Sequence, residues 1–108
     1  MLARANRLLR GDDFRKVMRS GKRHSTPHLV GYQLLESGSP TRFGFVVSKA
    51  CGKAVKRNQI KRRLRSLARE KMTQIQPGSQ IVLRALPGSA EQDFSSISSE
   101  FSEVLGLR

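Results

Sequence analysis

The first apolar pattern along the chain has a helical period. Three apolar side chains near its start are spaced three and four positions apart, namely Phe14, Val17 and Met18. This spacing predicts a short helix from about Asp13 to Arg19. Asp12 or Asp13 can cap the start of that helix, and Gly21 is expected to follow its end in the left-handed conformation. The preceding segment, Met1–Arg10, reads as an irregular basic arm.

Three later segments are short, apolar and bounded by turn residues, which is typical of strands: His28–Leu35, Arg42–Ser48 and Gln80–Leu86. In the first of them Val30, Tyr32 and Leu34 share one face. The turn Ser37–Pro40 separates the first two strands and predicts that they pair as an antiparallel hairpin. Lys49–Ala54 is expected to be a connector or a short edge strand.

Two further segments return to the helical period. From Val55 to about Lys71, Ile60, Leu64 and Leu67 lie on one face, and the opposite side carries Asn58, Lys61, Arg62, Arg65 and Arg69. The last amphipathic helix is predicted from Phe94, Ile97, Phe101, Val104 and Leu105. The phenylalanines Phe43, Phe45, Phe94 and Phe101 are expected in the core. The succession of elements predicts an α+β two-layer sandwich, formed by a single domain over residues 1–108.

The charge of the chain indicates what kind of partner the protein binds. The 108 residues carry a formal net charge of +13, and the pI is about 11.5. No acidic residue occurs between Glu36 and Glu70, a stretch that contains ten lysines and arginines. Such an imbalance favours polyanionic partners, RNA or DNA first and an anionic membrane surface second. No apolar run approaches the length of a membrane-spanning helix, so we expect a cytoplasmic protein.

The basic helix is the strongest candidate site. Arg57, Lys61 and Arg65 are spaced four apart and form one row along a helix about 24 Å long, which spans several phosphates. Arginine presents a planar fork that matches phosphate oxygens. A solvated helix face is the alternative, but its cations would repel one another without an anionic partner. Phe14 and Tyr32 are candidates for stacking on unpaired bases, although the pattern alone places Phe14 in the core.

Protein-borne catalysis is not expected. His24 and His28 are separated by Pro27, and the lone cysteine, Cys51, lacks a set of metal ligands around it and reads as a small packing residue. Asp12 and Asp13 are adjacent, while other carboxylates are isolated, so a two-metal nuclease site is not predicted. We therefore predict neither a catalytic residue nor a metal site in the protein, and no protein-bound organic cofactor.

One long motif resembles a known family. The segment Arg42–Arg65 is similar to the protein subunit of bacterial ribonuclease P, which carries a strand of the form G-x-x-V-S-K followed by G-K/N-A-V-x-R-N-x-x-K-R-x-x-R. The matching positions are Gly44, Val47, Ser48, Lys49, Gly52, Lys53, Ala54, Val55, Arg57, Asn58, Lys61, Arg62 and Arg65. The resemblance extends weakly to Leu8, Asp13, Phe14 and Val17 and covers nearly all of the chain.

The resemblance implies a four-stranded, mainly antiparallel sheet with three helices in the order αβββαβα. It also implies an unusual left-handed βαβ crossover around the basic helix. Members of the family are protein cofactors of a ribozyme, whose RNA subunit uses Mg²⁺ to cut the 5′ leader from precursor tRNA. The protein binds that RNA and holds the leader in a cleft between the first helix and the sheet. The implied partners are the catalytic RNA and precursor tRNA, without DNA or membrane.

The resemblance also assigns roles to residues of this sequence. The residues implied to bind the RNA subunit are Lys53, Lys56, Arg57, Asn58, Lys61, Arg62, Arg65 and Arg69. The residues implied to line the leader cleft are Phe14, Met18, Tyr32, Ser48 and Lys49. Lys61 and Arg65 are also candidates to face the leader. Two alternatives remain: a structural or general RNA-binding protein, and a DNA-binding helix protein.

Overall fold

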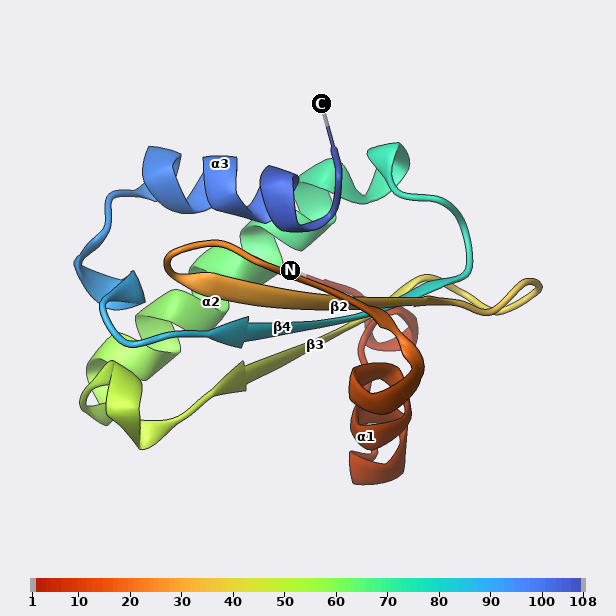
Figure 1. Ribbon diagram of the computed structural model, residues 1–108, viewed down its shortest axis with the longest axis horizontal. Helices are drawn as coiled ribbons and strands as arrows, with labels where there is room; N and C mark the ends of the chain where they lie inside the picture. The colour runs from red at the N-terminus through yellow and green to blue at the C-terminus, as the bar shows by residue number, and fades with distance from the viewer. Residues whose placement is uncertain (1, 108) are drawn as a thin grey trace.

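The computed structural model describes residues 2–107. In this range the α-helices and strands are α1 (Gly11–Ser20), β1 (Lys22–Ser25), β2 (Leu29–Leu35), β3 (Arg42–Val47), α2 (Ala54–Lys71), β4 (Ser79–Ala85) and α3 (Phe94–Val104). Helices α2 and α3 cover one face of the sheet, and α1 crosses the other face (Figure 1). The predicted α+β sandwich and the αβββαβα order are confirmed, and α1 adds a partial layer on the second face.

The sheet has the order β1-β2-β4-β3. The predicted hairpin between His28–Leu35 and Arg42–Ser48, which are β2 and β3, is therefore wrong. Strand β4 lies between β2 and β3 and pairs antiparallel with β2 and parallel with β3. Six of the seven residues of β4 are buried, the exception being Arg84. A strand whose residues are buried on both faces is stabilised most in the centre of the sheet. The hairpin is instead formed by β1 and β2.

Strand β1 had no counterpart among the strands located by the apolar pattern. Its four residues, Lys22–Ser25, are all polar and all exposed to solvent. An edge strand of this kind shows no alternation of apolar and polar residues, and its charges discourage pairing with other chains.

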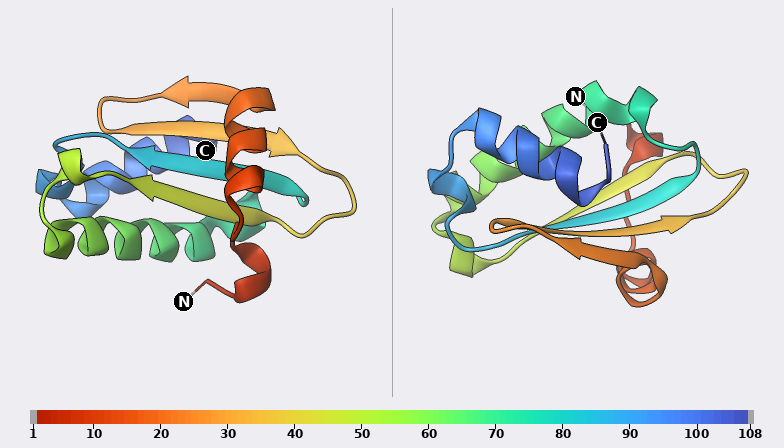
Figure 2. Two further views of the ribbon diagram at one scale, coloured as in Figure 1. Left: turned by 90° about the horizontal axis from the view of Figure 1, so that it is seen from below. Right: turned by 45° about the horizontal axis from the view of Figure 1, so that its top comes forward.

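The parallel pair β3 and β4 is joined by α2 through a left-handed crossover. Seen from the α1 side, both strands run to the left with β4 above β3, and α2 lies on the far face (left view of Figure 2). Nearly all βαβ units in proteins are right-handed, so sequence patterns alone do not predict this connection. The family resemblance implied it correctly.

Two apolar clusters hold the layers together. The larger lies between the sheet and the pair α2 and α3, and its fully buried side chains include Phe43, Leu64, Leu67, Ile81 and Phe101. The smaller lies under α1 and consists of Leu8, Val17, Val30, Tyr32 and Val82, with Phe14 and Met18 packed against it. Phe45 is half-buried and stacks on Phe43 with ring centroids 6.3 Å apart. The cores therefore use both faces of β2 and β4.

The start and end of α1 differ from the prediction. The helix begins at Gly11, and Asp12 and Asp13 lie inside its first turn, where their charge complements the helix dipole, rather than at the cap. Gly21 has an extended backbone, with φ −79°, and not the predicted left-handed conformation. A Cβ at Gly21 would lie 2.5 Å from the carbonyl oxygen of Val17. Glycine is required there because the helix end approaches the neighbouring backbone closely.

The last two helices agree with their predicted bounds within a residue or two. The carboxylate of Asp93 caps α3 by accepting a hydrogen bond from the Ser96 N–H at 2.8 Å. This bond holds the pKa of Asp93 below its usual range. The prediction that Phe94 belongs to the core is wrong, because this residue is 42% exposed at the first position of α3. The helix turns Ile97 and Phe101 toward the sheet instead.

Candidate nucleic-acid interface

Helix α2 presents the predicted basic face. Ile60, Leu64 and Leu67 are buried against the sheet, while the opposite side exposes Asn58, Arg62, Arg65 and Arg69. Arg57 and Lys61 are half-buried beside them. Among residues 2–107, the ion pairs of α2 are limited to Lys56 with Glu91, at 3.0 Å. The remaining cations of this helix form no ion pair in this range, although Arg63 donates a hydrogen bond to the Gln92 carbonyl.

Two of the predicted residues stand apart from this face. Lys56 lies on the side toward the turn Ser89–Glu91, and its hydrogen bond to Glu91 holds the pKa of that carboxyl below its usual range. Lys53 precedes the first residue of α2 and is exposed. Both cations are accessible, but Lys56 already has an acidic partner within the protein.

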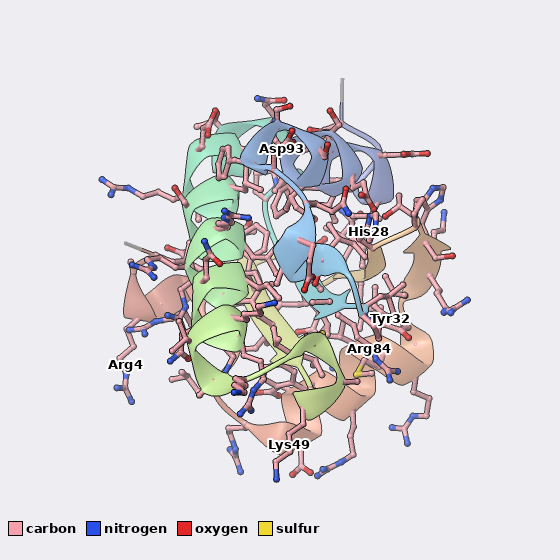
Figure 3. The ribbon with its side chains drawn as sticks, turned by 90° about the vertical axis from the view of Figure 1, so that its left-hand side faces the viewer. Arg4, His28, Tyr32, Lys49, Arg84 and Asp93 are labelled. Atoms are coloured by element: carbon pink, nitrogen blue, oxygen red, sulfur yellow. The ribbon has the colours of Figure 1, made fainter. Side chains whose placement is uncertain are left out.

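The N-terminal arm supplies cations that the sequence reading did not assign to a site. Arg4, Arg7, Arg10 and Arg42 surround a hollow of about 450 Å³ in which Asp13 is the acidic lining residue. A second hollow, of about 420 Å³, lies between the arm and α2 and is lined by Leu2, Arg7, Arg62, Arg65, Ser66 and Arg69. The arm therefore extends the basic face of α2 around the molecule toward α1 (Figure 3).

Two leucines explain why this arm is ordered. Leu2 and Leu8 are buried, and the Leu8 N–H donates a hydrogen bond to the Phe43 carbonyl at 2.8 Å. Asn6 donates a second bond from Nδ2 to the Thr41 carbonyl at 2.7 Å. These contacts attach the arm to the start of β3. The sequence analysis did not predict this docking; the leucines within the basic arm were the feature from which it could have been inferred.

A narrow groove joins the arm, α1, β3 and α2. It has a volume of about 210 Å³ and is lined by Arg7, Leu8, Leu9, Phe14, Phe43, Gly44, Phe45, Lys61 and Arg65. The groove places an aromatic ring predicted for the leader cleft, that of Phe14, beside two cations predicted for the RNA subunit, Lys61 and Arg65. An RNA strand that enters it would meet apolar and cationic groups together, as single-stranded nucleic acids require.

The α1 side of the sheet contains the other predicted cleft residues. Tyr32 is only 9% exposed and packs under α1, so most of its ring is core, and Met18 is half-buried beside it. Ser48 and Lys49 are exposed just beyond β3. Arg84, which the sequence reading did not assign, is exposed on β4 on the same face as Tyr32 (Figure 3). The sequence feature that could have indicated it is the single charged residue of an otherwise uncharged strand.

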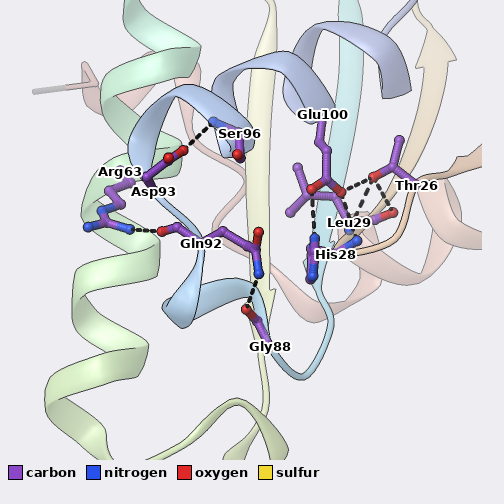
Figure 4. A network of polar contacts seen from close by, with 9 residues as sticks. All are labelled: Thr26, His28, Leu29, Arg63, Gly88, Gln92, Asp93, Ser96 and Glu100. Atoms are coloured by element: carbon purple, nitrogen blue, oxygen red, sulfur yellow. Dashed lines mark hydrogen bonds and ion pairs between the residues drawn. The ribbon is translucent and has the colours of Figure 1, made fainter.

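A separate polar network fastens α3 to the loop between β1 and β2 (Figure 4). The Glu100 carboxylate accepts hydrogen bonds from Thr26 Oγ1 and the His28 N–H, each at 2.7 Å, and His28 Nδ1 lies 2.7 Å from its second oxygen. Burial opposes ionisation of Glu100, but the bonds from Thr26 and His28 outweigh it and lower its pKa. An ionised carboxylate only accepts, so His28 Nδ1 carries the proton. This network is structural.

Other chemistry has little support in the described part of the chain. Within residues 2–107, no three His, Cys, Asp or Glu side chains lie close enough together to hold a metal ion. None of the helices in this range has the length and apolar character needed to cross a membrane. Cys51 is buried and its Sγ lies 3.3 Å from the Ala85 carbonyl, which confirms that it is a packing residue.

The fold and its surface therefore define a basic α+β protein suited to nucleic acid. The family model of ribonuclease P matches residues 2–107. The ribonuclease P protein component of Streptomyces avermitilis is 43% identical over 97% of this chain and 93% of its own length. That of Beutenbergia cavernae is 46% identical over 83% of this chain and 76% of its own. This chain belongs to the ribonuclease P protein family, the protein subunit of a tRNA-processing enzyme.

Solved structures support the same assignment. The ribonuclease P protein of Staphylococcus aureus superposes with a TM-score of 0.86 at 26% identity, over 95% of this chain and 94% of that one. The protein from Thermotoga maritima gives a TM-score of 0.82 at 27% identity, over 92% of this chain and 94% of that one. The likeness therefore extends over nearly the whole chain.

Proposed function

We propose that this chain is the protein cofactor of ribonuclease P. It binds the catalytic RNA subunit and the 5′ leader of precursor tRNA, and it promotes Mg²⁺-dependent, endonucleolytic removal of the leader to give the mature tRNA 5′ end. The RNA subunit carries the chemistry and its Mg²⁺, and the protein acts by positioning the two RNAs. The proposal places the protein in the cytoplasm, with RNA rather than DNA or membrane as its partner.

The observation that carries this proposal is the continuity of two surfaces. The cationic face of α2 and the arm provides a phosphate-binding surface whose arginines form no ion pair among residues 2–107. The groove at Phe14 opens from that surface through Lys61 and Arg65. One RNA can therefore bind across α2 while a second strand enters between α1 and the sheet.

In this proposal the residues of the sequence motif keep separate tasks. Arg57, Asn58, Arg62 and Arg69 contact phosphates of the RNA subunit, and Lys53 and Lys56 add cations at the start of the helix. Lys61 and Arg65 are shared between the two RNAs because they line the groove. The leader passes Phe14 and continues along the α1 side of the sheet. There Tyr32, Met18, Ser48 and Lys49 border its path, and Arg84 adds a charge for its phosphates.

A competition experiment separates this proposal from the two alternatives. The protein is titrated with its ribonuclease P RNA, with an unrelated structured RNA of the same length and with duplex DNA, at one salt concentration. We expect the ribonuclease P RNA to bind most tightly. Equal affinity for both RNAs would favour a general RNA-binding protein, and a preference for the duplex would favour a DNA-binding one. Salt dependence alone does not separate them, because every reading predicts a steep one.

A further inference from the structure

An exposed aromatic ring lies beside the basic face of α2, on the side opposite the N-terminal arm. Phe94 is 42% exposed, and together with Gln59, Arg62, Arg63 and Ser66 it lines a hollow of about 340 Å³. The hollow lies between α2 and the first turn of α3 and shares no lining residue with the groove at Phe14. A single exposed phenylalanine needs no explanation by itself, but its arginine-lined setting does.

This hollow is continuous with the RNA-subunit surface already described. Arg62 and Ser66 line both the hollow at Phe94 and the one between α2 and the arm. An RNA that covers Arg62 and Arg69 therefore needs to extend only past Ser66 to reach Phe94. The two hollows lie on either side of the same exposed helix face.

One of the two arginines beside the ring is held in place by a contact with the start of α3. The Arg63 guanidinium donates a hydrogen bond from Nη1 to the Gln92 carbonyl at 3.0 Å, which fixes it beside the start of α3 (Figure 4). Asp93 is the nearby acid: its carboxylate caps α3 through the Ser96 N–H and also attracts the Arg63 guanidinium, which leaves Arg62 as the cation without an acidic neighbour of this kind within residues 2–107. Arg62 is exposed and has no ion-pair partner among the described residues. The hollow thus keeps a cationic rim around an apolar ring.

We infer that Phe94 is a stacking platform for an unpaired base of the catalytic RNA, with Arg62 and Arg63 contacting the flanking phosphates. An aromatic face accepts any base, and arginines beside it bind the backbone that carries the base. The inference rests on the proposed function, because it names a further contact of the same RNA partner. It enlarges the RNA-subunit interface from α2 onto α3, a helix to which the sequence motif assigns no role.

The test compares Phe94→Ala, Phe94→Leu and Phe94→Tyr in the full chain, with Leu35→Ala as a matched control. Leu35 is 47% exposed at the end of β2, so its truncation also removes an exposed apolar group. The probe is ribonuclease P RNA transcribed from the genome that encodes this chain. We expect Phe94→Ala and Phe94→Leu to lose about fivefold or more in affinity, and Phe94→Tyr and Leu35→Ala to match the wild type. Wild-type affinity in Phe94→Leu would overturn stacking, because leucine keeps the apolar bulk without the ring.

A spectroscopic readout makes the test independent of affinity. The sequence contains no tryptophan, so Phe94→Trp creates a single tryptophan at the site, whose emission is excited selectively over that of Tyr32. We expect its emission to be quenched when the RNA binds, and that of Leu35→Trp to be unchanged. An unquenched Phe94→Trp, in a protein that still binds the RNA, would overturn this inference and leave the proposed function standing. Failure of the wild-type protein to bind the RNA would instead overturn both.

Discussion

Gly44 lies directly beneath the ring of Phe14, and this contact sets how closely α1 approaches the sheet. A Cβ built at Gly44 would be 2.4 Å from Phe14 Cε2 and 2.5 Å from its Cζ. Carbon atoms pack at about 3.5–4.0 Å, so Gly44→Ala forces the ring to move by about 1 Å or more. The ring packs on the sheet beside Leu8, so its displacement shifts α1 with it.

The expected cost follows from this overlap. Inserting a methyl group into a packed site typically costs about 1–3 kcal/mol. For a domain of roughly this size, each kcal/mol lowers the Tm by about 4–8 °C. Because Phe14 also lines the groove proposed for the leader, the substitution should weaken binding of leader-bearing precursor tRNA as well as stability.

A double-mutant cycle tests the assignment of this cost to one contact. Thermal unfolding is followed by circular dichroism for Gly44→Ala, Phe14→Ala and the double variant, with Gly31→Ala as control. A Cβ at Gly31 would lie 3.1 Å from the Val104 Cβ on the opposite face, so Phe14→Ala should not relieve its cost. We expect the Gly44→Ala penalty largely to disappear when Phe14 is truncated. An undiminished penalty in that background would refute the packing argument.

Three further predictions concern the RNA surfaces and the α3 network. Arg57→Ala and Arg65→Ala should each weaken assembly with the RNA subunit and reduce the slope of log affinity against log salt by about 1, whereas Arg19→Ala, on the exposed end of α1, should change neither. Tyr32→Ala should weaken binding of leader-bearing precursor more than leaderless tRNA, measured below its reduced Tm; equal losses would count against the cleft. Glu100→Gln should lower stability by about 1–3 kcal/mol at neutral pH. Because folding lowers the pKa of Glu100, that gap should close as the pH falls below about 4; a pH-independent gap would contradict the network.

The sequence predicted best where one local pattern determined the structure. The apolar spacing of Ile60, Leu64 and Leu67 located α2 within one residue of its observed start. Of the opposite positions, Asn58, Arg62, Arg65 and Arg69 are exposed and Lys61 is half-buried. The assignment of its motif to the ribonuclease P family is confirmed by the relatives. The roles of individual residues in binding RNA remain predictions.

The failures share a cause, which is that pairing and packing are not local. The Ser37–Pro40 turn joins β2 and β3, yet the apolar character of β4 on both faces places it between them. Gly21 was predicted to be a glycine because of a left-handed backbone. The structure instead requires glycine there because a side chain would collide with the Val17 carbonyl and with the backbone of β2. Phe94 was counted with the core from its helical spacing, but the first position of α3 points away from the sheet.

The predicted site was incomplete because it, too, depends on contacts between residues far apart in the sequence. The arginines of the arm become part of the surface only because Leu2 and Leu8 bind the arm against β3 beside α2. Arg84 lies beside Val30 and close to Tyr32 only because β4 pairs with β2 in the centre of the sheet. Neither juxtaposition follows from residues adjacent in sequence.

Reconstitution with the RNA subunit is the measurement that tests the central claim most directly. Precursor tRNA carrying a labelled 5′ leader is incubated with the protein alone, with the RNA subunit alone and with both, at low Mg²⁺. We predict no cleavage by the protein, little by the RNA, and efficient release of the intact leader by the two together. Robust cleavage by RNA-free protein, or no stimulation of the RNA subunit by the protein, would contradict the account.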